Sequence, residues 1–140
     1  MRVDIVCIGK LREDYLRAAQ AEYLKRLGPH ARLTIVEVAD EKAMERALTN
    51  GALLIALSID GKSLSSDSFA KFIQNMAIDG TPYLAFVIGG AEGLSPHILR
   101  LCRIKLSLSA MTFPHQLARI ILLEQIYRAF KIINNEPYHK

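Results

Sequence analysis

Residue types suited to building a ligand site gather in the last third of the chain. A glycine-rich turn, IGGAEGLS, occupies residues 88–95, and an irregular polar segment, SLSAMTF, occupies residues 107–113. Glycine has no Cβ, so such a turn lets the backbone approach a ligand closely. Both segments would stabilise a core poorly, and we expect them to form a pocket in which Leu108 and Met111 pack on a ring. The alternatives are a tight strand-to-helix turn for the glycines and core filling for Met111.

His115 and Arg119 lie one helical turn apart, so they share one side of the final helix. Leu123 and Ile126 fall on the same side, where the polar pair interrupts an apolar face. A polar pair there costs free energy unless its hydrogen bonds are satisfied. Either the pair lines a pocket, or His115 bonds the backbone at the helix start.

The chain ends in PYHK, which places a ring, an imidazole and a cation within four residues. If this tail is docked, Tyr138 could stack on a base, His139 could handle a proton and Lys140 could meet a phosphate. The alternative is a frayed basic terminus. Glu124 and Arg128 are spaced for an ion pair of structural role.

Several common site types are missing from the sequence. The glycine turn lacks the GxGxxG spacing of dinucleotide sites and the GxxxxGK[ST] spacing of a P-loop. No GxSxG segment marks a serine hydrolase, and no residue cluster has metal-ligand spacing. His30 and His97 have the context of surface residues. We therefore expect a site that uses no metal.

The net charge and the cysteine content indicate which kind of partner and which cellular compartment to expect. The formal net charge is +4, which is compatible with an anionic partner without requiring one. Cys7 and Cys102 have no CxxC spacing and are expected to be reduced core residues in a cytoplasmic protein. No apolar run is long enough for a membrane span, and no secretory signal begins the chain.

Apolar runs alternate with helical patterns, which predicts a single α/β domain over residues 1–140. Two of the runs are continuously apolar, as in strands of a parallel sheet covered on both faces. We expect strands at 3–8, 33–38, 53–59, 83–88 and 104–108, and helices at 11–27, 41–48, 66–77, 96–101 and 114–133. Loops are expected at 60–65 and 109–113. In such sheets ligands bind beyond the carboxyl ends of the strands, which here points to 58–62, 89–94 and 107–113.

The final helix has almost no polar face. Its apolar residues surround the helix and predict burial on every side: Leu117, Ile120, Ile121, Leu122, Leu123, Ile126, Ala129, Phe130 and Ile133. In a domain of this size one side would pack on the sheet and another on a second subunit. We therefore expect a homodimer with this helix in its interface; the alternative is a helix central to a monomer.

Four blocks in this order resemble the RlmH-type large-subunit ribosomal RNA methyltransferases of the SPOUT superfamily. The blocks are FVIGGAEGL at 86–94, LSLSAMTFPH at 106–115, EQIYRA at 124–129 and PYHK at 137–140. The resemblance covers essentially the whole chain. It implies a three-layer α/β fold with a mostly parallel sheet and a C-terminal trefoil knot, which chain-pattern rules would have excluded.

The resemblance also implies a cofactor, a substrate and an assembly. S-adenosylmethionine would contact eight residues: Leu57, Gly89, Leu108, Ser109, Ala110, Met111, Thr112 and Phe113. The enzyme would be a homodimer in which the tail of one subunit completes the site of the other. It would methylate N3 of a pseudouridine in 23S ribosomal RNA, acting on the assembled ribosome.

N3 of the base must lose its proton, so a positioned base or cation would assist transfer. The candidates are His139, His115 and Arg119, with Tyr138, His139 and Lys140 placing the substrate. We predict that His139→Ala keeps cofactor binding and loses methyl transfer. The residues leave open which group acts as the base.

Two departures from the family pattern concern loops. The segment between Asp40 and Leu53 is shorter and less basic than in the relatives, and Ser58 stands where an aspartate is common.

Other interpretations of the function are a methyltransferase for transfer RNA or a ribose hydroxyl, a non-catalytic ribosome-associated module, and a nucleotide-binding domain without RNA. The PYHK tail argues against the first of these, and the paired cofactor loops argue against the second.

Overall fold

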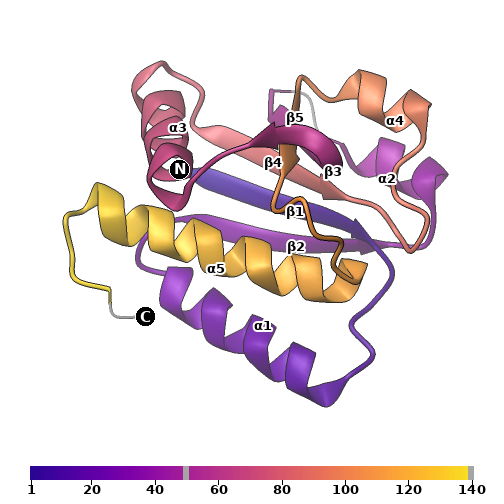
Figure 1. The fold of residues 1–140 in the computed structure, drawn as a ribbon, viewed down its shortest axis with the longest axis horizontal. Coiled ribbons are helices and arrows are strands. Elements are labelled where there is room, and N and C mark those ends of the chain that lie inside the picture. The colour runs from indigo at the N-terminus through magenta and orange to yellow at the C-terminus, as the bar shows by residue number, and fades with distance from the viewer. Residues whose placement is uncertain (49–50, 139–140) are drawn as a thin grey trace.

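The computed structural model describes residues 1–48 and 51–138, in which strands and helices alternate along the chain (Figure 1). The strands are β1 (Arg2–Ile8), β2 (Arg32–Val38), β3 (Leu53–Ser63), β4 (Tyr83–Ile88) and β5 (Ile104–Ser107). The helices are α1 (Asp14–Leu27), α2 (Glu41–Ala47), α3 (Ser66–Ile78), α4 (Pro96–Leu101) and α5 (His115–Ile133). Each expected element is present, and most boundaries differ from the expected ones by three residues or fewer.

The five strands form one sheet in the order β2-β1-β4-β3-β5, and every pairing is parallel. The central strands β1 and β4 are buried on both faces, as the continuous apolar run at 83–88 indicates for β4. Ile5 of β1 pairs with Phe86 of β4, and both side chains are 0% exposed. The carboxyl ends of the strands therefore meet at one edge of the sheet.

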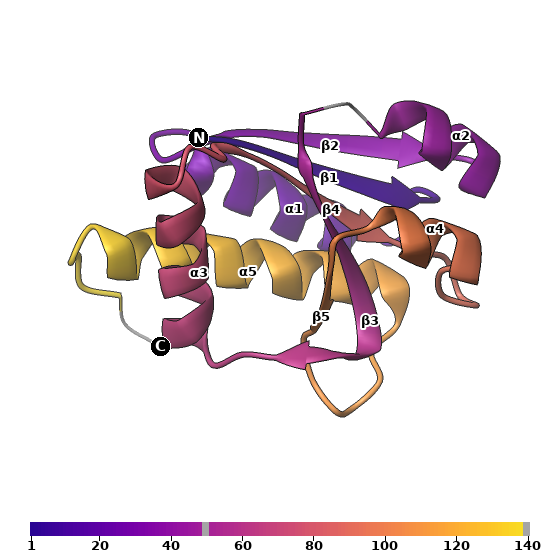
Figure 2. The same cartoon turned by 90° about the horizontal axis from the view of Figure 1, so that it is seen from above.

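Helices cover both faces of the sheet, which confirms the three-layer arrangement (Figure 2). Helices α1, α3 and α5 pack on one face, where Leu16, Ile73 and Leu123 join the larger core. On the other face α2 and α4 contribute Met44 and Ile98, both 0% exposed, to a smaller core. The side chains of each strand alternate between the two cores because successive residues point to opposite faces.

Hydroxyl and carboxylate side chains fix the starts of three helices. Asp40, Ser65 and Ser95 accept hydrogen bonds from the backbone N–H groups at the starts of α2, α3 and α4. Each bond satisfies a donor that the first helical turn leaves free. Pro114 precedes α5 as its N-cap residue, one position before the first turn where we expected it.

Within one chain, helix α5 is buried on the side that faces the sheet and α1, as expected for one of its two apolar sides. Seven of its residues are buried against the sheet and α1: Arg119, Ile120, Leu122, Leu123, Ile126, Ala129 and Phe130. Leu117 and Ile132 are each 38% exposed, and Ile121 is half-buried. The sheet can cover only one side of a helix, so the opposite apolar side faces outward. The homodimer that would cover it stays a prediction.

Both cysteines are free and buried, as expected. Burial raises the pKa of the Cys7 thiol to about 11 and also raises that of Cys102.

Only a thiolate attacks disulfide reagents. We expect Cys7 of the native protein to react with a disulfide reagent at pH 8 about 100-fold more slowly than in urea, because a two-unit shift lowers the thiolate fraction by that factor. Equal rates in both states, measured by thionitrobenzoate release, would contradict this burial.

Candidate functional site

A cleft of about 980 Å³ opens at the carboxyl edge of the sheet. It lies where β3, β4 and β5 end, and the first turn of α5 closes one side of it. The three segments that line it are Leu57–Asp60, Ile88–Leu94 and Leu106–His115, apart from Ala110. Chain segments far apart in sequence thus meet where the sequence pattern placed the site. The volume is at the upper end of the range for pockets that hold small ligands.

The structure brings seven of the eight expected cofactor contacts into this one cleft: Leu57, Gly89, Leu108, Ser109, Met111, Thr112 and Phe113. Ala110 is exposed and outside the lining. Met111 is 76% exposed, so it fills no core and its thioether is free to cover a ligand. His115 also lines the cleft, together with Ala118 one turn further along α5.

The glycine turn after β4 folds back on itself. Gly90 and Gly93 form an isolated antiparallel bridge, and the N–H of Gly93 donates to the carbonyl of Gly90 at 3.0 Å. Gly93 has a φ of +77°, a conformation that favours glycine. A Cβ on Gly89 would lie 2.5 Å from the carbonyl carbon and oxygen of Gly93. Gly89 therefore permits a backbone contact that no other residue would allow.

Strand β3 is longer than expected and forms the opposite wall of the cleft. Both Leu57 and Lys62 pair with Leu106 of β5, so the segment Ser58–Gly61 bulges out and returns to the same point. A Cβ on Gly61 would lie 2.7 Å from the carbonyl carbon of Lys105. The expected loop at 60–65 is therefore wrong: the chain stays paired through Ser63. Gly61 within a polar run was the sequence signal for this extended pairing, and we did not predict the pairing from it.

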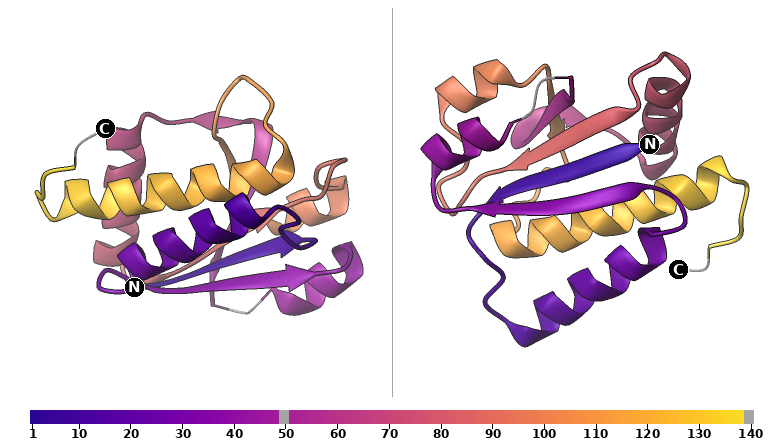
Figure 3. Two further views of the ribbon diagram at one scale, coloured as in Figure 1. Left: turned by 90° about the horizontal axis from the view of Figure 1, so that it is seen from below. Right: turned by 180° about the vertical axis from the view of Figure 1, so that it is seen from behind.

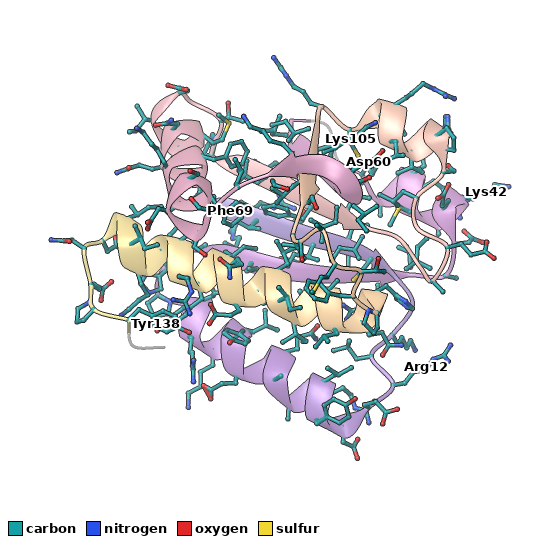
Figure 4. The ribbon with its side chains drawn as sticks, in the orientation of Figure 1. Arg12, Lys42, Asp60, Phe69, Lys105 and Tyr138 are labelled. Atoms are coloured by element: carbon teal, nitrogen blue, oxygen red, sulfur yellow. The ribbon has the colours of Figure 1, made fainter. Side chains whose placement is uncertain are left out.

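A carboxylate stands on this bulge at the rim of the cleft. The hydroxyl of Ser58 donates to Asp60, and this hydrogen bond is the largest cause that lowers the pKa of the Asp60 carboxyl. The charge of Lys105 acts in the same direction, and both side chains project from the same region of β3 and β5 (Figure 4). Glu92 lies on the glycine turn across the cleft. An aspartate is common in the family at position 58. Here Ser58 instead donates a hydrogen bond to the carboxylate of Asp60, two residues further along the chain.

Arg119 points away from the cleft into the protein. It is 1% exposed, and its guanidinium donates to Glu37 at 2.7 Å, to Gln20 at 3.1 Å and to the carbonyl of Gly9 at 3.1 Å. Its Nε is buried and has no partner among the described residues. His115 therefore lines the cleft while Arg119 is buried inside the protein, although the two residues lie one turn apart on α5.

The tail is folded back on α5 as far as Tyr138. The Tyr138 hydroxyl donates to Glu124, and its ring lies edge-on to Tyr127 with centroids 5.1 Å apart. The guanidinium of Arg128 lies 4.4 Å from the centre of the same ring and 2.8 Å from the Glu124 carboxylate. His139 and Lys140 lie outside the described residues. Tyr138 is therefore docked rather than frayed, and the expected Glu124–Arg128 ion pair is confirmed.

In both views of Figure 3 the chain leaves the carboxyl end of α5 and turns back along the helix, whereas the first turn of α5 lies at the other end. His115 at the first turn lines the cleft, whereas Tyr138 contacts Glu124, Tyr127 and Arg128. With a rise of about 1.5 Å per residue, the six residues of helix from the cleft-lining Ala118 to Glu124 span roughly 9 Å. The described part of the tail therefore contacts the middle of α5 and not the cleft.

We expect Tyr138→Phe to remove a phenol that titrates well above the ordinary tyrosine value. Burial, followed by the hydrogen bond to Glu124, raises the pKa of Tyr138 to about 12 from its ordinary value near 10. A raised pKa means that docking of the neutral phenol is fully effective below about pH 10 and is lost as pH rises through about 12. Tyrosinate absorbance between pH 9 and 13 would measure the loss; an unchanged titration curve would contradict the docked position.

The other histidines take structural places. His30 is half-buried and stacks on Phe130 with ring centroids 5.7 Å apart, so it is not the plain surface residue that we expected. His97 is exposed, as expected, and pairs with Glu45 at 3.0 Å. Within residues 1–48 and 51–138 no group of three His, Cys, Asp or Glu is placed to hold a metal ion. None of the helices described is long and apolar enough to cross a membrane.

The cleft suits a flat, partly apolar, cationic ligand. Leu57, Ile88 and Leu108 offer apolar walls for a ring, and the rim carries the carboxylates of Asp60 and Glu92. Opposite charges attract across such a rim, so a positively charged ligand is favoured over an anion. The hydroxyl-rich segment Ser107–Thr112 adds side-chain and backbone partners for polar edges.

Comparison with known proteins agrees with this geometry. A family described as "Predicted SPOUT methyltransferase" matches residues 1–139. "Ribosomal RNA large subunit methyltransferase H" of Bifidobacterium animalis subsp. lactis is 48% identical over 159 aligned positions that cover 100% of both chains. The alignment is longer than this chain of 140 residues, so that relative has additional residues.

Two solved structures share the fold at low sequence identity. A probable methyltransferase from Bordetella pertussis Tohama I superposes with a TM-score of 0.63 at 13% identity, covering 91% of this chain and 95% of its own. The SpoU methyltransferase AviRb from Streptomyces viridochromogenes, in complex with the cofactor AdoMet, superposes with a TM-score of 0.52 at 15% identity. That match covers 96% of this chain and 58% of the other.

Proposed function

The chain belongs to the SPOUT methyltransferase family, and from this premise we propose that it methylates large-subunit ribosomal RNA with S-adenosylmethionine as methyl donor. The finer proposal is transfer to N3 of a pseudouridine in 23S ribosomal RNA on the assembled ribosome, in the cytoplasm. The observation that carries the proposal is the cleft at the ends of β3, β4 and β5. It gathers seven of the eight residues that the family resemblance assigns to the cofactor.

The residues of the cleft fit this cofactor. Leu57, Leu108 and the backbone of the glycine turn would hold the adenine ring, and the Asp60 and Glu92 carboxylates favour the positive charge of a sulfonium. When bound, the cofactor supplies an electrophilic methyl group, which needs no metal for activation. The protein must then place the acceptor nitrogen in line with that group and remove the proton from the nitrogen.

We assign proton removal to His139, acting from the tail of a second subunit. Arg119 is committed to its contact with Glu37, and His115 sits among the cofactor contacts. Tyr138 is docked on the middle of α5 at Glu124, whereas the cleft of the same chain lies at the first turn of that helix. A homodimer that pairs the outward apolar side of α5 would supply the tail of the partner instead. This arrangement agrees with the exposed Leu117 beside the cleft-lining Ala118.

Exposed cations lie at the same edge of the sheet and could meet RNA phosphates. Lys10 and Arg12 are exposed and follow β1, and the N–H of Arg12 donates to Gln116 of α5 at 2.9 Å. This bond holds the loop beside the cleft, and the Arg12 side chain extends outward there (Figure 4). Cations fixed in this way position a nucleic acid through its phosphates without reading its sequence.

The trefoil knot belongs to the proposal as well. It follows from the family to which the chain belongs. The return of the segment Ser58–Gly61 to Leu106 is a bulge of β3 on β5, and the close backbone approach there explains the glycine at position 61.

Mixed dimers test the proposed sharing of the site. One subunit carries His139→Ala, and the other carries Gly89→Ala, which damages the cleft. Neither homodimer should transfer methyl groups efficiently, whereas the mixed dimer has one intact cleft facing one intact tail and should recover activity. Absence of recovery, with dimers verified by sedimentation, would contradict a site shared between subunits.

We expect Gly89→Ala to weaken S-adenosylmethionine binding at least 10-fold, because its Cβ overlaps the Gly93 backbone and opens the turn that lines the cleft. Gly28→Ala is the matched control: Gly28 lies at the end of α1 outside the cleft, and its Cβ would lie 3.4 Å from the carbonyl oxygen of Lys25, an ordinary contact. Titration calorimetry measures both affinities. Equal affinity of Gly89→Ala and the wild type would remove the turn from the cofactor site.

A further inference from the structure

The end of α5 is built to reverse the chain. The N–H of Glu136 donates to the carbonyl of Lys131 at 2.8 Å, and the N–H of Asn135 donates to that of Ile132 at 3.0 Å. Asn135 has a φ of +54°, which completes the Schellman pattern of a helix end. The side chains of Lys131 and Glu136 add an ion pair at 3.2 Å. Pro137 then stiffens the chain just before Tyr138.

The reversed tail meets a preformed receptor on the same chain. Glu124 already accepts a hydrogen bond from Tyr23 of α1 at 3.1 Å and pairs with Arg128 at 2.8 Å. Tyr23 and Tyr127 lie with ring centroids 6.4 Å apart and form an aromatic wall beside the carboxylate. These contacts join residues of α1 and α5 and do not include the tail itself.

Tyr138 uses three kinds of contact at once in this receptor. Its hydroxyl bonds Glu124, its ring meets Tyr127 edge-on, and the Arg128 cation covers one ring face. Such aromatic and cation–π contacts each stabilise a docked ring, and together they fix its orientation as well as its position. The side chains of Glu124 and Arg128 are only 21% and 22% exposed, so water screens these contacts weakly.

We propose that Glu124, Arg128, Tyr127 and Tyr23 form a latch that positions the C-terminal tail for methyl transfer. The inference rests on the proposed function, since the tail carries the acting histidine there. With Tyr138 anchored, the chain that follows it starts from a fixed point, so less of the tail has to be ordered when it enters the cleft of the partner. Without the latch the tail would have to be ordered at each turnover, which lowers kcat rather than cofactor affinity.

Glu124→Gln tests the latch because it keeps the size of the side chain while it removes the charge that pairs with Arg128. Glu45→Gln is the matched control: it makes the same change in an ion pair with His97, far from the tail. Two measurements are made on each dimer: release of Tyr138 by carboxypeptidase, followed by mass spectrometry, and kinetics of methyl transfer to ribosomes.

We expect Glu124→Gln to speed Tyr138 release at least 10-fold and to lower kcat roughly 10- to 100-fold with an unchanged dissociation constant for S-adenosylmethionine. Tyr23→Phe, which removes one hydrogen bond to Glu124 and keeps the ring, should show a smaller change of the same kind if Glu124→Gln does not fold. Unchanged Tyr138 release, or unchanged kcat despite a released tail, would overturn the latch. A wild type that protects Tyr138 but methylates no acceptor would contradict the proposed function and leave docking itself intact.

Discussion

Replacing His139 with alanine is expected to lower kcat for methyl transfer at least 100-fold and to leave S-adenosylmethionine affinity unchanged. The acceptor nitrogen must lose a proton, and a positioned general base contributes roughly 100- to 10,000-fold to such a step. The cofactor cleft is formed without the tail, so truncating the imidazole leaves it intact. Single-turnover transfer to ribosomes and calorimetric cofactor binding measure the two effects separately.

Raising the pH provides a check on this assignment. A small base that replaces the imidazole, or a higher concentration of hydroxide, should partly restore transfer by His139→Ala if proton removal is what was lost. His115→Ala is the comparison, because His115 lines the cleft and its loss should act on cofactor affinity. Unchanged turnover of His139→Ala would remove His139 from the mechanism.

Arg119→Met is expected to lower the free energy of unfolding by about 3 kcal/mol. Removal of one partner from a buried ion pair typically costs about 3–5 kcal/mol, and the partly exposed Glu37 carboxylate places this pair at the lower end. The variant also leaves the carbonyl of Gly9 and the side chain of Gln20 without their donor. Urea unfolding followed by circular dichroism measures the change.

Arg26→Met is the matched control, since Arg26 pairs with Glu22 on the exposed side of α1 and its loss should change stability far less. Where the Arg119 variant remains folded, its kcat should be near that of the wild type. Normal stability combined with lost methyl transfer would instead make Arg119 a catalytic residue and contradict the structural role we propose.

The positions of the elements followed from the sequence because each carries a local signal. Continuous apolar runs at 53–59 and 83–88 predicted the strands β3 and β4, and the helical pattern at 66–77 predicted α3. The edge of the sheet that holds the cleft followed from the parallel order of the strands. These inferences use only neighbours in sequence and the alternation of strand and helix.

Other features depend on contacts between distant segments, which local patterns do not encode. The extension of β3 through Ser63 arises because Gly61 lets it approach β5, and its polar residues resemble a loop. The separation of His115 from Arg119 depends on Glu37 of β2, a residue 82 positions away from Arg119. The docking of Tyr138 depends on the reversal at Asn135, for which asparagine was the available signal.

The central claim is that this chain transfers a methyl group to the large-subunit RNA of an assembled ribosome. The most direct measurement supplies labelled S-adenosylmethionine with ribosomes that lack the modification, alongside naked ribosomal RNA and transfer RNA. We predict that label enters the ribosome sample alone and maps to N3 of one pseudouridine. Label in transfer RNA, or in no acceptor while the cofactor still binds, would contradict the account.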